Sequence, residues 1–241
     1  MVRWHGDSVD TTDSIEISRP IRGAALRDSY VDAIGALTLG IARFSDNEVR
    51  VGPVTMLRFG EPRVGANFVE WPIEGGLLAR GGGTWRIEAG DGRVRATATR
   101  HRPALPRLVY DLSHRHVHLL LTRLYLLRLR GEEPRPGRKA SREDRARSAA
   151  VDVAFCLSLA GVTGLRRPRR VLLLLAAYHV ACWSITGRTL GGLVLRERVV
   201  SVDGSRLTPT QALYRFALLP VSWVVRRPVH DEVAGTTVIR D

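Results

Sequence analysis

Alternating apolar and polar positions predict strands in the first half of the chain, over 48–59, 83–89 and 93–99. Gly90-Asp91-Gly92 separates the last two runs, and an Asp-Gly pair is a strong signal for a hairpin turn. After Pro106, leucines recur at helical spacing over about 107–130, and a second helix is expected at about 23–38. Residues 1–131 therefore predict a soluble α+β domain, β-rich with a long C-terminal helix.

The two ends of this first domain carry few apolar residues. The first fourteen residues are polar and lack an apolar signal-peptide core, so we expect a mobile tail there. Residues 132–143 combine prolines, a glycine and a run of charges, which predicts a linker.

The second half contains the most apolar runs of the chain, at 146–165, 171–186 and 212–225. Twenty helical residues extend about 30 Å, the hydrocarbon thickness of a bilayer, so the first run predicts a transmembrane helix. The second is slightly short for a span. The third contains Arg215 and Pro220 and predicts an interfacial or re-entrant helix that starts at a Thr208 cap with a Gln211 capping box; a third span is the alternative.

Charged residues flank every apolar run, which favours membrane helices over buried helices of a soluble domain. A segment of about 100 residues also lacks the cover that so much apolar length would need. Between the helices, 193–202 predicts a strand with a turn at Asp203-Gly204, and 235–239 is expected to pair with it. The predicted second part, 144–241, is thus an α-helical membrane module with a small β-hairpin.

Composition adds a strong positive charge, with 37 Lys and Arg against 24 Asp and Glu and a net charge of +13. The arginines cluster beside the apolar runs, which favours anionic lipid headgroups over nucleic acid as the partner. The positive-inside rule then predicts a multi-pass protein of the cell membrane with a cytosolic N-terminal domain. The arginine-rich 166–170 loop contradicts this orientation if the first two runs both span, so its side is left open.

Four short motifs in the second half resemble the RDD family of bacterial membrane proteins, named for one Arg and two Asp. The resemblance covers about 144–241. Its residues are Arg145 with Asp152 seven positions later, the glycine turn with Gly187, Thr189 and Gly191, the 198–204 strand followed by Arg215, and the closing segment with His230, Asp231, Gly235 and Thr236. The turn lacks the family's usual lysine. The resemblance implies a membrane module, with transport or ion exchange suggested for some members.

Helical geometry places Arg145 and Asp152 on one face, about 10.5 Å apart along the axis. A lone acid in hydrocarbon costs about 2.5–3.5 kcal/mol on insertion scales, so Asp152 needs a partner, and we expect Arg215 to supply it. Asp231 is expected to pair with Arg145 or Arg147. Two interpretations remain open: an ion- or proton-linked acid, and a polar clamp that fixes helix packing.

Other candidate chemistry is weak. His114 and His118 share a helical face with metal-binding spacing, and Asp111 lies one turn earlier, but a basic solvated face is the simpler interpretation. The glycines at 187, 191 and 192 lack a phosphate-loop lysine, and no nucleophile elbow is present. With two cysteines, a disulfide scaffold is excluded. We expect no enzyme, no cofactor and no metal.

The leading hypothesis is an integral membrane protein of RDD type that handles an ion or small solute, or supports a membrane partner or a homo-oligomer. The alternative is a membrane-anchored binding protein whose N-terminal domain holds an apolar ligand or lipid.

Overall fold

The protein was analysed as a computed structural model, which describes residues 1–131, 135–165 and 167–240. The chain divides into two compact units, Met1–Gly131 and Glu132–Asp241. We call them the N-terminal unit and the C-terminal unit, and each is described by itself.

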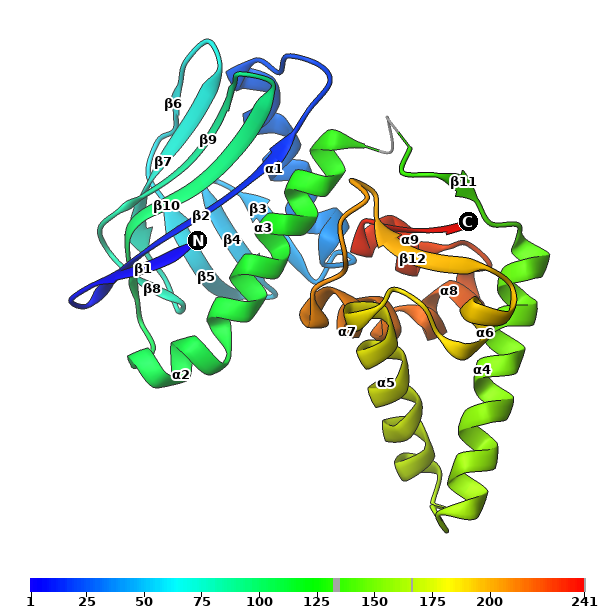
Figure 1. Ribbon diagram of the computed structural model, residues 1–241. Coiled ribbons are helices and arrows are strands. Elements are labelled where there is room, and N and C mark those ends of the chain that lie inside the picture. The colour runs from blue at the N-terminus through cyan, green and yellow to red at the C-terminus, as the bar shows by residue number, and fades with distance from the viewer. Residues whose placement is uncertain (132–134, 166, 241) are drawn as a thin grey trace. The chain divides into compact units, whose positions relative to one another are not determined.

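The N-terminal unit is built on a ten-stranded antiparallel sheet with the strand order β1-β2-β10-β9-β7-β5-β4-β3 (Figure 1). β6 pairs with β7 and β8 pairs with β10 at the sides of this path. The strands are β1 (Val2–His5), β2 (Ser8–Glu16), β3 (Ala42–Ser45), β4 (Glu48–Val51), β5 (Val54–Phe59), β6 (Arg63–Val64), β7 (Phe68–Gly75), β8 (Ala79–Arg80), β9 (Thr84–Gly90) and β10 (Arg93–Pro103).

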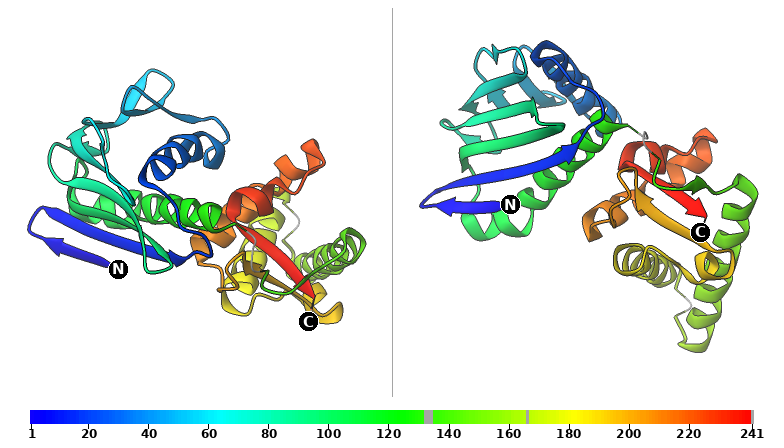
Figure 2. Two further views of the ribbon diagram at one scale, coloured as in Figure 1. Left: turned by 90° about the horizontal axis from the view of Figure 1, so that it is seen from above. Right: turned by 45° about the horizontal axis from the view of Figure 1, so that its top comes forward.

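Helices α1 (Gly23–Leu37) and α3 (His114–Arg130) cover one face of this sheet, and α2 (Arg107–Leu112) precedes α3 (Figure 2). The core lies between the helices and the sheet. It forms because alternate residues of the central strands point inward, as Trp71 and Ile87 do, and meet Leu26 and Tyr125 from the helices. This arrangement confirms a β-rich N-terminal region closed by a helical segment.

The predicted hairpin turn is present between β9 and β10, where Asp91 and Gly92 both adopt positive φ angles of 50° and 69°. The run at 48–59 forms two strands, β4 and β5, because a turn at Gly52 divides it. The expected long helix is likewise divided, at Ser113, into α2 and α3.

The expectation of a mobile N-terminal tail is wrong. β1 and β2 form a hairpin, and β2 pairs along β10 from Val9 to Glu16. The polar composition misled the prediction, because only Val9 and Ile15 are apolar among the inward positions 9, 11, 13 and 15 of β2, and Thr11 and Asp13 occupy the others.

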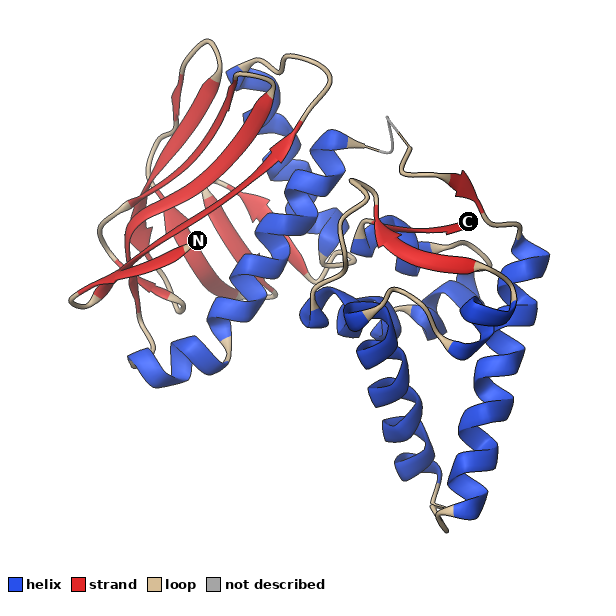
Figure 3. Cartoon of the chain, viewed as in Figure 1, coloured by secondary structure: helices blue, strands red, loops and turns tan. Residues whose placement is uncertain are grey.

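The C-terminal unit combines a three-stranded antiparallel sheet, in the order β11-β13-β12, with helices (Figure 3). The predicted pairing of the two longer strands is present, with Val199 opposite Val238. The elements are β11 (Arg138–Lys139), α4 (Arg142–Val162), α5 (Pro168–Ile185), α6 (Leu190–Val194), β12 (Glu197–Ser201), α7 (Pro209–Ala217), α8 (Leu219–Val225), α9 (Val229–Ala234) and β13 (Thr236–Arg240).

Helices α4 and α5 form a hairpin that projects from the three-stranded sheet (Figure 1). They occupy the two runs in which we expected transmembrane helices. In the part of the chain that the structure describes, no helix has both the length and the apolar character needed to cross a membrane.

The third apolar run forms two short helices, α7 and α8, which meet at Leu218 before Pro220. The alternative of a third span is therefore wrong. The Thr208 cap is present, since its hydroxyl accepts a hydrogen bond from the Gln211 N–H at 3.2 Å. The Gln211 side chain does not complete a capping box, because it bonds Ser201 and the carbonyl of Ala234 instead.

Part of the segment expected to be a linker is structured. β11 pairs with β13, and Ala140 is buried in the core of the C-terminal unit beside Val238. Residues 132–134 of that segment, Arg166 of the loop whose side was left open, and Asp241 lie outside the described residues.

Candidate functional site

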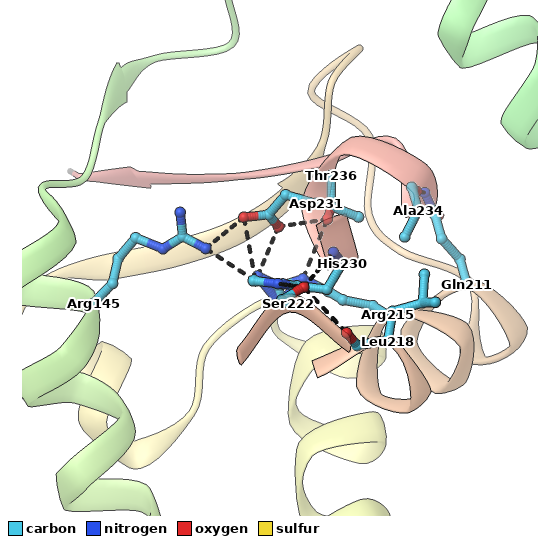
Figure 4. A network of polar contacts seen from close by, with 9 residues as sticks. All are labelled: Arg145, Gln211, Arg215, Leu218, Ser222, His230, Asp231, Ala234 and Thr236. Atoms are coloured by element: carbon cyan, nitrogen blue, oxygen red, sulfur yellow. Dashed lines mark hydrogen bonds and ion pairs between the residues drawn. The ribbon is translucent and has the colours of Figure 1, made fainter. Parts of the chain in front are cut away.

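The charged residues singled out from the sequence form two separate clusters in the C-terminal unit. In the first, Asp231 of α9 lies between two guanidinium groups (Figure 4). Arg145 of α4 binds its Oδ2 atom, and Arg215 of α7 binds Oδ1 at 2.8 Å. The expected pairing of Asp231 with Arg145 is thus present, and Arg215 joins it from another helix. We call these three residues the Asp231 cluster.

Burial alone would raise the pKa of Asp231, but the positive charges of Arg215 and Arg145 outweigh it and hold the pKa below its usual value. The carboxyl group is therefore ionised at neutral pH. Arg215 is only 3% exposed, and its guanidinium also lies 4.5 Å from the ring centre of Trp183. One carboxylate thus serves two cations whose positions are fixed by packing.

His230 extends this cluster toward α8. Its Nε2 atom lies 3.1 Å from an Arg145 nitrogen, which can only donate, so we assign the Nδ1–H tautomer. Nδ1 then donates to the Ser222 hydroxyl oxygen at 2.7 Å, and Ser222 donates to the carbonyl of Leu218. Burial lowers the pKa of His230 to about 4, so the ring is neutral at pH 7.

The closing motif has a clear structural role. Gly235 ends α9 in the left-handed conformation, with φ of 58°, and lets the chain turn directly into β13. The Thr236 hydroxyl then donates to Asp231 Oδ1 at 2.8 Å and accepts from Arg215 Nε at 3.2 Å. The motif therefore holds Asp231 at the point where α7, α9 and β13 meet.

Asp152 of α4 lies in the second cluster, and the prediction that Arg215 is its partner is wrong. Its Oδ1 atom accepts hydrogen bonds of 2.8 Å from the Tyr178 hydroxyl and from the Gly191 N–H. His179 Nε2 lies 3.9 Å from Oδ2. Arg215 is drawn instead to Asp231. The acid is thus satisfied by neutral donors from α5 and the glycine turn.

The glycine turn brings the backbone against α4. A Cβ at Gly191 would lie 2.1 Å from the Ser148 carbonyl oxygen, so only glycine allows this approach. Thr189 caps α6 by accepting a hydrogen bond from the Gly192 N–H at 3.1 Å. Gly187 has φ of 76°, and its carbonyl accepts a hydrogen bond of 2.8 Å from the Val199 N–H of β12. These residues position a backbone donor for Asp152.

A cavity of about 470 Å³ lies between the two clusters. Side chains of α4, α5, α7, α8, α9 and β12 line it, including Asp152, His179 and His230. Sequence reasoning placed the acid and His230 correctly in the module but gave no sign that a cavity joins them. This cavity is the candidate site of the C-terminal unit.

Sequence analysis missed Ser222 and Glu197 of the cavity wall and Tyr178, which bonds Asp152. No spacing signal marks Tyr178 or Ser222. Glu197 is 3% exposed, and its Oε1 atom has no hydrogen-bond partner among the described residues. Burial, together with the nearby Asp144, raises its pKa. The sequence signal that could have identified Glu197 was its position as a single acid between Arg196 and Arg198.

The N-terminal unit contains a second cavity, of about 250 Å³, between α1, α3 and strands β3 to β5. Its lining is almost entirely apolar, with Tyr30, Tyr125, His114 and His118 among the few polar side chains. The Nδ1 atom of His114 is buried and has no partner in the described part of the chain.

The histidines of α3 are not arranged as a metal site. Asp111 is ion-paired with Arg115 at 3.0 Å, and in the described ranges no group of three or more His, Cys, Asp or Glu side chains could hold a metal ion. His101 and His118 instead stack, with ring centres 6.3 Å apart. The idea that His114 and His118 lie on a solvated face is also wrong, because both side chains are half-buried and His118 Nε2 lies 3.1 Å from the Thr11 hydroxyl of β2. Burial lowers the pKa of His118 to about 3.

Comparison with known proteins agrees with the sequence resemblance. A model of the RDD family matches residues 170–237, which include the glycine turn, Arg215 and most of the closing motif. No curated protein and no solved structure matches the chain significantly. Arg145 and Asp152 lie before the matched range, yet α4 brings both into contact with residues inside it. The N-terminal unit lies outside the match.

Proposed function

We propose that this is a membrane-associated protein held at the bilayer by the α4–α5 hairpin of its C-terminal unit. One observation carries the proposal: the hairpin buries only a narrow stripe, which includes Asp152 and His179, and leaves many of its large apolar side chains exposed. In α4, burial is confined to a stripe of Ser148, Asp152, Cys156 and Ala160. In α5, only His179 and Trp183 are buried.

The outward positions of the hairpin are apolar. Val162 is 87% exposed and Leu173 is 68% exposed, and the same outer surface carries Val153, Phe155, Leu157, Leu159 and Leu172. Contiguous exposed apolar side chains of this kind mark a membrane or protein contact. The match with the RDD family supports the membrane.

The hairpin carries charges at both ends. Its apolar part in α4, residues 149–162, extends about 21 Å, less than the 30 Å of hydrocarbon. Arg167, Arg169 and Arg170 follow at the tip of the hairpin. Long arginine side chains can extend from a backbone within the hydrocarbon layer to the lipid headgroups. We propose that the hairpin enters the bilayer with its tip at headgroup level. A multi-pass topology with a cytosolic N-terminal unit is part of the same proposal.

Within this proposal Asp152 acts as a packing clamp. Its hydrogen bonds to Tyr178 and Gly191 join α4, α5 and α6 at one point. Handling of an ion or small solute remains the alternative role of the cavity, and we propose no enzymatic activity.

Fractionation of cells that express the full chain tests the membrane proposal. We expect the protein to stay in the membrane pellet after both a high-salt and a carbonate wash, because apolar insertion resists both. Release by high salt would overturn insertion and indicate a peripheral basic protein. If the outer surface instead packs on another membrane protein or a second copy, detergent extraction followed by size-exclusion chromatography would show a larger species.

The apolar cavity of the N-terminal unit supports a second candidate function, the binding of an apolar ligand. An enclosed apolar cavity of about 150 Å³ is enough to bind benzene, and this one is larger. The unpartnered His114 Nδ1 atom in its wall favours a ligand with one polar group. This would be a membrane-anchored binding protein for a lipid-like molecule.

Titration of the full chain with a fluorescent polyene fatty acid tests this candidate. We expect saturable binding that Ile34→Trp, which fills the cavity, weakens by about tenfold. Leu112→Trp, at an exposed position of α2, is the matched control and should bind as the wild type does. Equal weakening by both variants, or no saturable binding, would contradict a ligand site.

A further inference from the structure

The cavity of the C-terminal unit is strongly basic. Six of its lining residues are arginines, namely Arg142, Arg145, Arg198, Arg215, Arg226 and Arg227. The carboxylates at its wall are Asp152 and Glu197, and Asp231 stands behind Arg145 and Arg215. Positive side chains exceed the acids even when Asp231 is included. A cleft lined mainly by one sign of charge concentrates ions of the opposite sign.

The arginines occupy two positions relative to the cavity. Arg145 and Arg215 are held by the single carboxylate of Asp231, so their combined charge exceeds that of their partner. Arg226 and Arg227 follow α8 at a more exposed position. Arg227 pairs with Glu232 at 3.3 Å, whereas Arg226 has no ion pair with the described carboxylates. An anion entering past α8 would therefore meet cations both at the entrance and at the wall.

The entrance beside Arg226 is apolar. Trp223 lines the cavity and is 89% exposed, and Val224 and Val225 are exposed after it. An exposed tryptophan with apolar neighbours, followed directly by arginines, is typical of residues at the boundary between lipid chains and headgroups. A free phosphate ion would gain nothing from these side chains, whereas a lipid would.

Glu197 gives the cavity a preference for a hydrogen-bond donor, in addition to its preference for an anion. Its Oε1 atom is buried at the cavity wall and unpartnered within the described ranges, while Ser148 bonds the side chain from α4. A buried carboxylate oxygen without a donor costs free energy that a bound hydroxyl would recover. The cavity is thus suited to a phosphate with a hydroxyl group nearby.

We propose that this cavity binds the phosphate headgroup of an anionic phospholipid, with the arginines on the phosphate and Trp223 against the start of the acyl chains. The proposal rests on the proposed membrane association of the same unit. Phosphatidylglycerol fits the donor set best, because its glycerol hydroxyl groups can donate to Glu197.

Vesicle flotation of the purified full chain tests the site, using phosphatidylglycerol mixed into phosphatidylcholine and pure phosphatidylcholine as the two membranes. We expect the wild type to prefer the first membrane at high salt, where diffuse surface attraction is screened. Arg226→Gln combined with Arg227→Gln should reduce this preference by about tenfold, because two charged contacts are lost.

Arg19→Gln combined with Arg22→Gln is the matched control. It removes the same charge from exposed positions of the N-terminal unit, away from the cavity lining, and should keep the preference within about twofold. Equal losses in both double variants would overturn the site in favour of diffuse electrostatic attraction. No preference in the wild type would overturn it as well.

Two further arms separate this site from free phosphate binding and from failure of membrane association. Inorganic phosphate that binds the cavity with the same arginine dependence, without any lipid preference, would overturn the lipid assignment. If the chain floats with neither membrane, membrane association fails, and short-chain phosphatidylglycerol below its micellar concentration then tests the cavity alone. Saturable quenching of tryptophan fluorescence that the Arg226 and Arg227 double variant loses would support the site, and its absence would overturn it.

Discussion

Asp231 is central to the charge balance of the C-terminal unit, because one buried carboxylate is the shared partner of Arg145 and Arg215. Pairing of this kind need not add net stability, since desolvation of the charges opposes their attraction. Removing the shared partner is different, because it leaves two guanidinium groups without compensation. Arg215 has almost no access to water with which to replace it.

We therefore predict that Asp231→Asn destabilises the C-terminal unit by about 3–5 kcal/mol, the usual effect of breaking a buried ion pair. Denaturant unfolding in mild detergent, followed by tryptophan fluorescence, measures the change. Glu232→Gln, next in sequence and paired with Arg227 at the surface, is the control and should cost less than about 1 kcal/mol. Similar losses for both variants would show that the cluster is not a specific network.

Gly191 is a second position where one residue decides the packing. We predict that Gly191→Ala destabilises the unit by about 2–4 kcal/mol, because the added Cβ would collide with the Ser148 backbone and displace the donor to Asp152. Thermal unfolding measures this. Gly161→Ala is the matched control, since nothing lies within 4 Å of its Cβ and alanine favours the helix. A neutral Gly191→Ala would refute the close approach.

Substitutions of Asp152 distinguish the two roles that the sequence left open, a polar clamp that fixes packing and an ion- or proton-linked acid. An amide oxygen can accept the same bonds from Tyr178 and Gly191, so we predict that Asp152→Asn changes the free energy of unfolding by less than about 1.5 kcal/mol. Asp152→Ala leaves buried donors unpaired and should cost about 2–3 kcal/mol. Ion flux into proteoliposomes that Asp152→Asn abolishes, at unchanged stability, would contradict the packing role.

At the scale of elements, the narrow buried stripe and the exposed apolar side chains of the α4–α5 hairpin lead to a prediction about lipid. We expect Leu157→Ser combined with Leu173→Ser to weaken vesicle binding by about tenfold or more, because two exposed apolar side chains leave the hydrocarbon. Flotation measures the change. Leu108→Ser combined with Leu112→Ser, equally exposed in the N-terminal unit, should bind normally. Unchanged binding by the hairpin variant would exclude this surface as the contact.

Local patterns predicted many elements but few of the contacts between them. The β9–β10 turn and the Thr208 cap follow from short-range chemistry, and both are present. The hairpin of β1 and β2 was missed because its stability comes from pairing with β10, some eighty residues away. Sequence spacing placed Arg145 and Asp152 on one helical face, but it carries no information on how α7 and α9 meet. The true partner of Arg215 was therefore missed.

At the scale of the molecule, the two units differ in what can be read from their sequences. The C-terminal unit carries motifs whose residue types and spacing match a known family over 170–237. The N-terminal unit offers only alternation and turn signals, which indicate a β-rich fold but no ligand. Its cavity depends on how the curved sheet, α1 and α3 pack, and no single residue in the sequence marks it.

The two units should also respond differently to acid. Three histidines, the buried His101 and the half-buried His114 and His118, lie together in the N-terminal unit, and burial lowers the pKa of each, to about 4 for His101. The unfolded chain takes up protons on these groups below pH 6.5, whereas the folded unit does not until the pH is much lower. The free energy of unfolding of the N-terminal unit is therefore highest above pH 6.5, where these histidines are neutral in both states. It falls as the pH drops toward 4.

We predict that the N-terminal unit loses about 3 kcal/mol through His101 alone over this pH range, with further losses from the other two histidines. In the C-terminal unit the lowered pKa of Asp231 protects its ion pairs until the pH falls below the usual range of an aspartate, although neutral His230, whose pKa is also lowered to about 4, adds a loss similar to that of His101 alone. Hydrogen–deuterium exchange of the full chain between pH 7 and pH 4 measures both units together. Protection should decrease first in β2, β10 and α3.

His118→Gln should flatten this dependence, and His116→Gln, at an exposed position of α3, should leave it unchanged. A pH-independent N-terminal unit would mean that the three rings are accessible to protons in the folded state, and the packing of α3 against β10 described above would then be wrong.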